Sequence, residues 1–489
     1  YSPNGALSAT LLPSGCVVIA EAATGRQVTQ LPTDATTMNL DFSPKGSFLV
    51  TWARPTTGSN TNLKVWNVSS GECVCSYTQK HYKKDLIQWT ADEVICCRVV
   101  TNEVHILNGL HPEQGIVGKV YHKGVNTFKL CPLSAKPYIC VFCPSAGGKN
   151  GQLALYRYNS TESAKPAGTE ELVAAAASEA NMLWSPTGAA VLIHTQADVD
   201  SSNNSYYGSS GLTIMSCSGC MDGSPEKDMI NPLSAAVSQG KDGPIHDVRW
   251  SPMGTQFVIS AGAMPCVCTL HNHKGEQIYD FGSAHRNTIS WSPHGRFLAL
   301  AGFGNLVGDI DFYDTQAKKI KKMSTNNAHC SVAHAWSPDS RYFMTATLAP
   351  RMNVDNGFKI FRYDGKGPIF TEHLDHCYDA LWVPTLPEVY PNRARSPSRA
   401  PADGIGDASA TAKAETMAAA KPAAAPAAPY RPRGSTGALS EALKRPTTQA
   451  GKVMPNKAVP GSGPAGSASS GKYVAPQRKI PGMAPGGVP

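Results

Sequence analysis

The stretch Val248–Ser260 reads V-R-W-S-P-M-G-T-Q-F-V-I-S, and it decides the fold of this chain. An apolar segment ends in Trp250, the residues Ser251–Gly254 contain a Pro and a Gly, and a second apolar segment, Gln256–Ser260, follows. Pro and Gly favour a tight turn, and short apolar segments on both sides of a turn favour two antiparallel strands. The stretch therefore predicts a β-hairpin.

The same phrase, an aromatic residue followed by Ser, Pro, any residue and Gly, returns along the chain. With weaker copies included, nine copies begin at positions 1, 42, 89, 131, 184, 250, 291, 336 and 382, at intervals of 41 to 66 residues. Further short strands, such as Leu63–Val68 and Ile310–Asp314, complete a unit of four strands, which is typical of a propeller blade. The sequence predicts an all-β fold, a nine-bladed WD40-like β-propeller over residues 1–390, in which the first blade lacks an upstream strand.

The composition changes after Tyr390. Residues 391–489 hold 14 of the 44 Lys and Arg but only 4 of the 36 Asp and Glu, so the preceding residues are close to neutral. This segment is rich in Pro, Ala and Gly and has too little apolar surface to fold, which predicts a disordered basic tail. A near-neutral platform with a cationic arm favours a polyanionic partner such as ribosomal or other nucleic acid, and a merely solubilising tail is the alternative.

Several classes of function lack their sequence features. No run of about 18 apolar residues predicts a membrane helix, and the cysteines lie in apolar alternating segments, which favours a reducing, cytoplasmic compartment. No phosphate-binding Walker loop and no G-x-S-x-G nucleophile motif occurs, and the glycines of residues 302–308 have the wrong spacing for a dinucleotide loop. Cys140 and Cys143 have the spacing of a zinc half-site, but a strand would send them to opposite faces. We expect no enzyme activity, no cofactor and no metal.

The inserted loops and the later blades carry strings that generic propellers do not share. They are Asp198-Val199-Asp200, Ser205-Tyr206-Tyr207-Gly208, Gly243–Val248, Asp280-Phe281-Gly282, Arg286-Asn287, Leu300–Leu306, Ala349-Pro350-Arg351 and Asn356-Gly357. Through these strings the chain resembles the eukaryotic translation initiation factor 2A family, the single-chain factor that is unrelated to the GTP-dependent heterotrimer. The resemblance implies a nine-bladed propeller over about residues 1–390.

The resemblance also implies a function. That function is GTP-independent delivery or stabilisation of initiator Met-tRNA on the small (40S) ribosomal subunit, mainly in non-standard initiation. The partners it implies are the small subunit and initiator Met-tRNA, with mRNA and other initiation factors as further expected partners and no membrane.

Candidate RNA-binding or ribosome-binding residues fall in the projecting loops and in the tail. In the propeller they are Tyr206, Tyr207, Arg286, Asn287, Asn305 and Arg351. In the tail they are Arg431, Arg433, Lys444, Arg445, Arg478 and Lys479. Arg286 and Arg351 are the strongest candidates, because a planar cation without a forced internal partner suits a phosphate. Asn287 and Asn305 are interpreted equally well as internal turn residues.

Three other classes stay open. The chain could be another translation propeller, the large scaffold subunit of initiation factor 3, or a protein scaffold whose binding depends only weakly on salt. A propeller enzyme would need clustered carboxylates, or a nucleophile with a base, at the central channel.

Overall fold

The computed structural model describes residues 1–392 except 57–60, 147–149, 160–161, 167–171, 175–176, 198–208, 218–232, 238, 242, 318, 350 and 353. The predicted tail, including Arg431, Arg433, Lys444, Arg445, Arg478 and Lys479, lies outside the described residues. So do Tyr206 and Tyr207. No helix in the described part of the chain is long and apolar enough to cross a membrane.

The described residues form antiparallel sheets whose strands pair in sequence order, except that the fifth strand of the fourth sheet pairs with the third strand of that sheet. The first sheet contains β1 (Leu7–Leu11), β2 (Val17–Glu21) and β3 (Gln27–Leu31), and the second contains β4 (Thr37–Phe42), β5 (Phe48–Ala53), β6 (Leu63–Asn67) and β7 (Cys73–Tyr77). The third contains β8 (Ile87–Trp89), β9 (Ile95–Val100), β10 (Glu103–Asn108) and β11 (Ile116–Tyr121). The fourth contains β12 (Thr127–Leu130), β13 (Tyr138–Cys143), β14 (Gly151–Asn159), β15 (Glu162–Pro166) and β16 (Leu172–Ala174).

The fifth sheet contains β17 (Glu179–Trp184), β18 (Ala190–Ala197), β19 (Ser209–Ser216) and β20 (Leu233–Ala236), and the sixth contains β21 (Ile245–Trp250), β22 (Gln256–Ala261), β23 (Cys266–Asn272) and β24 (Gln277–Ala284). The seventh contains β25 (Thr288–Trp291), β26 (Phe297–Ala301), β27 (Asp309–Asp314) and β28 (Lys321–Asn327). The eighth contains β29 (Ala333–Trp336), β30 (Tyr342–Thr347), β31 (Gly357–Arg362) and β32 (Pro368–His373). Two short 3-10 helices are η1 (Pro112–Gln114) and η3 (Pro387–Val389).

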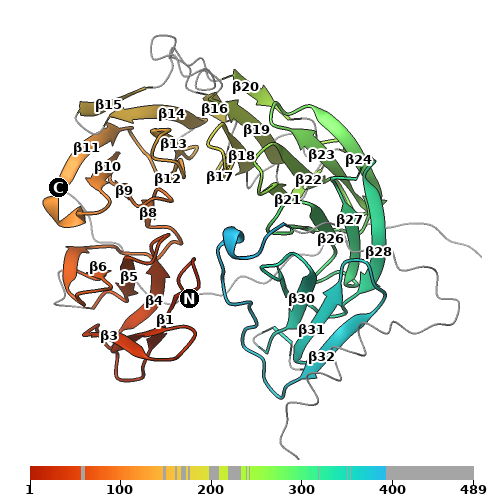
Figure 1. Cartoon of the computed structure of the whole chain (residues 1–489). Helices are drawn as coiled ribbons and strands as arrows, with labels where there is room; N and C mark the ends of the chain where they lie inside the picture. The colour runs from red at the N-terminus through yellow and green to blue at the C-terminus, as the bar shows by residue number, and fades with distance from the viewer. Residues whose placement is uncertain are drawn as a thin grey trace, which may run out of the picture. The chain divides into compact units, whose positions relative to one another are not determined.

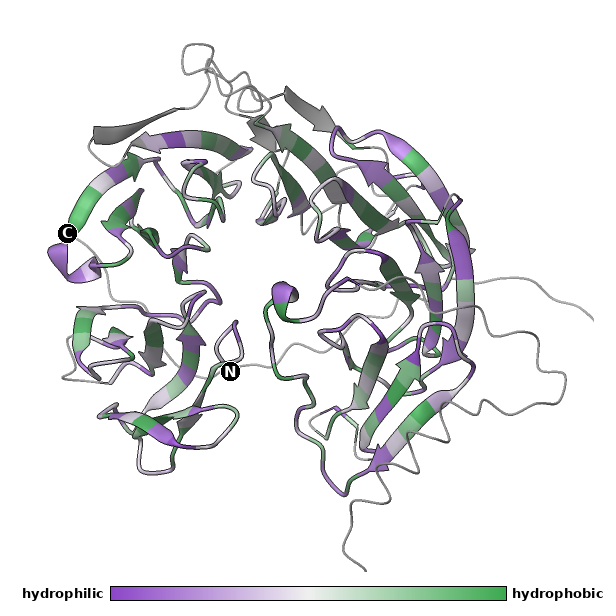
Figure 2. Cartoon of the chain, viewed as in Figure 1, coloured by the Kyte–Doolittle hydropathy of each residue, from purple (hydrophilic) through white to green (hydrophobic). Residues whose placement is uncertain are grey.

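Within the unit Tyr1–Ala400 these sheets are arranged in a ring. Figure 1 shows β8, β12 and β21 toward the centre and β11, β24, β28 and β32 toward the outside. The second strands β5 and β26 are buried along their whole length because neighbouring sheets cover both faces, whereas β32 is exposed throughout. Figure 2 shows hydrophobic residues along the inner strands and hydrophilic residues along many turns and outer strands. The predicted all-β propeller architecture is confirmed.

The repeated Ser-Pro-x-Gly phrase works through its serine and its glycine. In the turn after β25, Ser292 is fully buried, and its hydroxyl oxygen accepts a hydrogen bond from the backbone N–H of Phe297 at 3.0 Å. Gly295 has a φ of 70°, a left-handed conformation that is easy only for glycine. Ser43 makes the same contact with the N–H of Phe48 at 2.9 Å. The phrase therefore closes each first hairpin locally, which explains why it marks the repeat.

The number of nine blades is not confirmed. The described residues form eight sheets, and the ninth copy, which contains Trp382, forms no strand there. Its indole N–H nevertheless donates to the carbonyl of Ala335 at 3.2 Å, just as the indole of Trp336 donates to Ser290 at 3.0 Å. The ninth copy thus takes the next inner position of the ring without building a sheet, because the segment before it, including the exposed Tyr378 and Leu381, makes no ladder among the described residues.

Candidate functional site

Two kinds of connection share one rim of the ring. Because strands within each sheet alternate in direction, the loops between second and third strands lie at the same rim as the connectors that lead from one sheet to the next. We call this side the connector rim, and the opposite side, which carries the Ser-Pro-x-Gly turns, the turn rim. Loop 302–308, loop 348–356 and the connector 285–287 all belong to the connector rim.

The glycine loop 302–308 is held at its base by Asn287. The side-chain amide of Asn287 donates to the carbonyl of Phe303 at 2.9 Å and accepts from the backbone N–H of Phe303 at 2.9 Å. Phe303 itself is buried, and the N–H of Gly304 donates to the carbonyl of Ser331 at 3.0 Å. Asn287 is therefore an internal turn residue, one of the two interpretations that the sequence left open, and it fixes the loop for the residues beyond it.

Two polar residues beyond this base, Asn305 and Arg351, are exposed. Nη2 of Arg351 donates to Oδ1 of Asn305 at 2.7 Å, joining loops from two neighbouring sheets, and both side chains are exposed. The guanidinium also lies over Gly304, since a Cβ built there would come within 3.3 Å of Nη2. Arg351 makes an ordinary turn through its N–H and the carbonyl of Leu348 at 3.1 Å. The structure thus brings two predicted site residues, Asn305 and Arg351, together at the surface.

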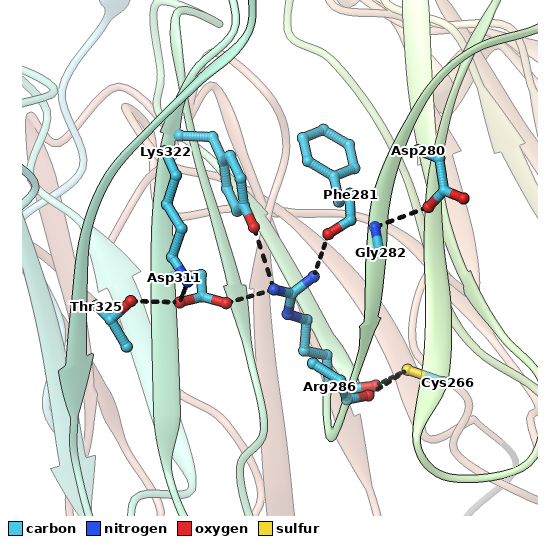
Figure 3. A network of polar contacts seen from close by, with 10 residues as sticks. Cys266, Asp280, Phe281, Gly282, Arg286, Asp311, Lys322 and Thr325 are labelled. Atoms are coloured by element: carbon cyan, nitrogen blue, oxygen red, sulfur yellow. Dashed lines mark hydrogen bonds and ion pairs between the residues drawn. The ribbon is translucent and has the colours of Figure 1, made fainter.

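The expectation that Arg286 is free to bind phosphate is wrong. The residue is 6% exposed, and its guanidinium pairs with Asp311 on β27, as Figure 3 shows. It also donates to the hydroxyl of Tyr313 at 3.1 Å and to the carbonyl of Phe281 at 3.4 Å. A buried and paired guanidinium cannot reach a phosphate, so Arg286 is a structural residue that ties one sheet to the next.

Asp311 is the centre of this network. It accepts from Lys322 at 2.6 Å and from Thr325 at 2.8 Å in addition to Arg286. Burial by itself would raise the pKa of Asp311, but the hydrogen bonds from Lys322 and Thr325 and the charge of Arg286 hold it below its ordinary value. Burial likewise favours a lower pKa for Arg286, but the charges of Tyr313 and Asp311 raise it. Both groups are therefore charged at neutral pH.

Known proteins resemble this chain over most of its length. A family model described as "Eukaryotic translation initiation factor eIF2A" matches residues 174–380. The eukaryotic translation initiation factor 2A of Dictyostelium discoideum is 39% identical over 361 residues, which are 72% of this chain and 55% of that protein. A solved structure described as the crystal structure of the eukaryotic initiation factor matches with a TM-score of 0.68 at 32% identity, over 79% of this chain and 90% of that one. The chain belongs to the eukaryotic translation initiation factor 2A family.

The family match covers the later part of the ring. It includes Asn287, Asn305 and Arg351, so the exposed pair lies in the region that defines the eukaryotic translation initiation factor 2A family. The chain spans about half the length of the Dictyostelium relative, 55%. A component of eukaryotic translation initiation factor 3 from Xenopus laevis is also similar, 30% identical over 158 residues, 31% of this chain and 22% of that protein.

The connector rim also carries cations that the sequence analysis did not single out. They are Arg54, Lys80, Lys83, Lys84 and Lys123, all exposed. The run Lys80-His81-Tyr82-Lys83-Lys84 is a local signal in the sequence, but its charge disappears in the near-neutral average of residues 1–390. Arg54 and Lys123 give no such signal, because they join the run only when the sheets are placed side by side.

Proposed function

We propose that this chain is a translation initiation factor that binds the small (40S) ribosomal subunit through its connector rim. In this proposal it promotes GTP-independent delivery or stabilisation of initiator Met-tRNA in non-standard initiation, with mRNA and other initiation factors as further partners. It acts in the cytoplasm by binding, without a catalytic step. Membership of the eukaryotic translation initiation factor 2A family supports the role in initiation.

The observation that carries the docking surface is the exposed Arg351, which is hydrogen-bonded to a neighbouring loop that Asn287 fixes. Its hydrogen bond to Asn305 uses Nη2, and a guanidinium has five N–H donors in a rigid plane. Arg351 forms no ion pair with a described residue, which leaves its remaining donors for a phosphate or a backbone carbonyl of a partner. Because Asn287 and Gly304 fix the neighbouring loop, little conformational freedom is lost when a partner binds.

The test is co-sedimentation of the full chain with purified small ribosomal subunits, with and without initiator Met-tRNA. We expect Arg351→Glu to weaken the affinity about tenfold, which corresponds to about 1.4 kcal/mol, since a charge that favours phosphate is replaced by one that repels it. We also expect initiator Met-tRNA to increase the amount of chain that sediments with the ribosomal particle.

The matched control is Arg26→Glu. Arg26 is exposed, lies at the turn rim in the turn between β2 and β3, and pairs only with Glu21 among the described residues. We expect this variant to bind the small subunit like the unchanged chain. Equal affinities for Arg351→Glu, Arg26→Glu and the unchanged chain would refute docking through the connector rim.

A second candidate is a propeller scaffold of another initiation complex. The similarity to the component of initiation factor 3 favours it. Such a scaffold would bind other initiation factors in the absence of the small subunit, and its binding would not respond to initiator Met-tRNA. Pull-down of purified initiation factors without ribosomes distinguishes the two functions.

A further inference from the structure

Five exposed cations lie on three neighbouring connections of the connector rim. We call them the basic rim patch: Arg54 after β5, Lys80, Lys83 and Lys84 between β7 and β8, and Lys123 between β11 and β12. The connections are held together, because Nζ of Lys83 donates to Oδ1 of Asn126 in the next connector at 2.7 Å. The loop after β5, which carries Arg54, is tied to the connector that carries Lys80, because the side-chain amide of Asn62 donates to the carbonyls of Ala53 and Gln79, each at 2.8 Å. The three connections of the patch therefore lie side by side.

The charges of the basic rim patch are not compensated by the acids beside them. Asp85 is adjacent but pairs with Lys129 at 2.6 Å, and Asp34 pairs with Lys64 at 3.0 Å. Among the residues that the structure describes, none of the five patch cations forms an ion pair. Such a concentration of one sign of charge produces a local potential that attracts polyanions, although the residues before the tail are close to neutral overall.

The same rim has the opposite balance at the last two sheets. In the described part of these two sheets, the exposed cation of the rim is Arg351, and four acidic residues are exposed on the same rim. The acids are Asp309, Asp355, Asp375 and Asp379. The connector rim is thus polarised, positive over the sheets β4–β7, β8–β11 and β12–β16 and acidic over the sheets β25–β28 and β29–β32. The first region therefore attracts a polyanion more strongly than the second, where Arg351 is an exposed cation among these acids.

A cleft and an exposed aromatic side chain lie beside the basic rim patch. Lys83 and Lys84 line a cleft of about 190 Å³, which they share with Asn126. Tyr121, at the end of β11 and two residues before Lys123, is 65% exposed. Cations next to an exposed aromatic ring are the combination that binds unpaired nucleic acid, because the cations neutralise phosphates while the ring stacks on a base.

We propose that the basic rim patch binds the phosphate backbone of unpaired RNA and that Tyr121 stacks on one of its bases. This site is separate from the tail, to which the sequence assigned all of the basic excess. The inference rests on the proposed function only in one respect, namely that the RNA in the cell is ribosomal.

The test measures binding of a fluorescently labelled 20-nucleotide oligouridylate to the full chain by fluorescence anisotropy between 50 and 200 mM salt. The variant combines Lys80→Gln, Lys83→Gln and Lys84→Gln. Loss of three phosphate contacts should make the slope of log K against log salt shallower by about 2. It should weaken binding by about a hundredfold at 50 mM salt and by about sixfold at 200 mM salt. Tyr121→Ala should weaken binding about fivefold or more without changing the slope.

The control removes three exposed lysines of the turn rim, where the charge change is the same, and leaves the tail intact. Its substitutions are Lys45→Gln, Lys274→Gln and Lys366→Gln. This variant should bind the oligonucleotide with the affinity and the salt slope of the unchanged chain. Circular dichroism and melting of each variant establish that it is folded, and a variant with Arg in place of the three patch lysines should bind normally.

Equal losses in the patch variant and the control variant would overturn the proposal, because the contact would then be a non-specific effect of charge. Unchanged oligonucleotide binding with weaker binding to small ribosomal subunits would also overturn it, since the patch would then contact a protein. Weaker oligonucleotide binding with unchanged affinity for the small ribosomal subunit would support the patch as an RNA site and would count against the proposed function instead.

Discussion

Removal of the Arg286 guanidinium should destabilise the ring and leave its binding surface unchanged. The side chains of Arg286 and Asp311 are 7% and 10% exposed, so Arg286→Met removes one of the two cations that pair with a buried carboxylate. Breaking such a pair typically costs about 3–5 kcal/mol. Asp311 keeps Lys322 at 2.6 Å and Thr325 at 2.8 Å, and we therefore expect the lower end, about 3 kcal/mol.

The assay is equilibrium unfolding in urea, followed by tryptophan fluorescence. The double variant Arg286→Met with Asp311→Asn also removes the buried charge that has lost Arg286, so it should be at least about 1 kcal/mol more stable than the single variant. Arg26→Met, which breaks an ion pair with an arginine that is 72% exposed, is the control and should not change unfolding measurably.

Two results would refute this reasoning. One is a free energy of unfolding of Arg286→Met that equals the value of the unchanged chain. The other is additivity in the double variant, which would mean that the two side chains are not coupled. At a temperature where it is folded, Arg286→Met should also keep full affinity for the small subunit, in contrast to Arg351→Glu.

Burial and, to a smaller extent, a nearby arginine lower the pKa of His334 to about 4. As the pH falls, the unfolded chain therefore takes up a proton at this histidine before the folded chain does. The free energy of unfolding should fall by up to about 3 kcal/mol between pH 6.5 and pH 4. His334→Phe should remove that pH dependence, which melting at pH 7.5 and pH 5 would measure, and a titration of the histidine by NMR near pH 6.5 would contradict the argument. Gly5→Ala should lower the melting temperature more than Gly25→Ala. The two glycines have nearly equal φ values of 71° and 70°, so the backbone strain of the substitution is the same. A Cβ on Gly5 would lie 1.7 Å from a backbone carbonyl oxygen, whereas a Cβ on Gly25 would meet nothing within 4 Å. Asn287→Ala should destabilise the chain by about 2 kcal/mol and speed hydrogen exchange across residues 302–308, because two hydrogen bonds to the loop backbone are lost. Unchanged hydrogen exchange in these residues would show that the loop does not depend on the Asn287 amide.

The hairpins were predictable because their determinants are local. Ser292 contacts a backbone N–H five residues away, and Gly295 needs a conformation that its own lack of a side chain permits. Such interactions are complete within one turn, so they recur with the repeat and can be recognised in the sequence. The ninth copy, Trp382-Val383-Pro384, keeps only the aromatic residue and the proline of the phrase, and it forms no strand among the described residues, since a strand also needs a neighbour to pair with.

The two arginines show why the site was only partly predictable. Arg286 and Arg351 both lie between predicted strands, and both were predicted to bind phosphate. The partner of Arg286, Asp311, is 25 residues away on β27, and the packing around the connector buries the pair. Arg351 meets Asn305, 46 residues away, at the surface, where the guanidinium stays accessible.

The sequence by itself determined the all-β repeat, the positions of its turns and the basic character of the last residues, because these follow from interactions within a few neighbouring residues and from composition. Only the tertiary structure decided which cations are buried and which are exposed, and only it placed Arg54, Lys83 and Lys123 on one surface. The physical reason is that a long charged side chain pairs with groups that are close to it in space. Packing of the sheets decides which groups these are, and they can be far away in the sequence.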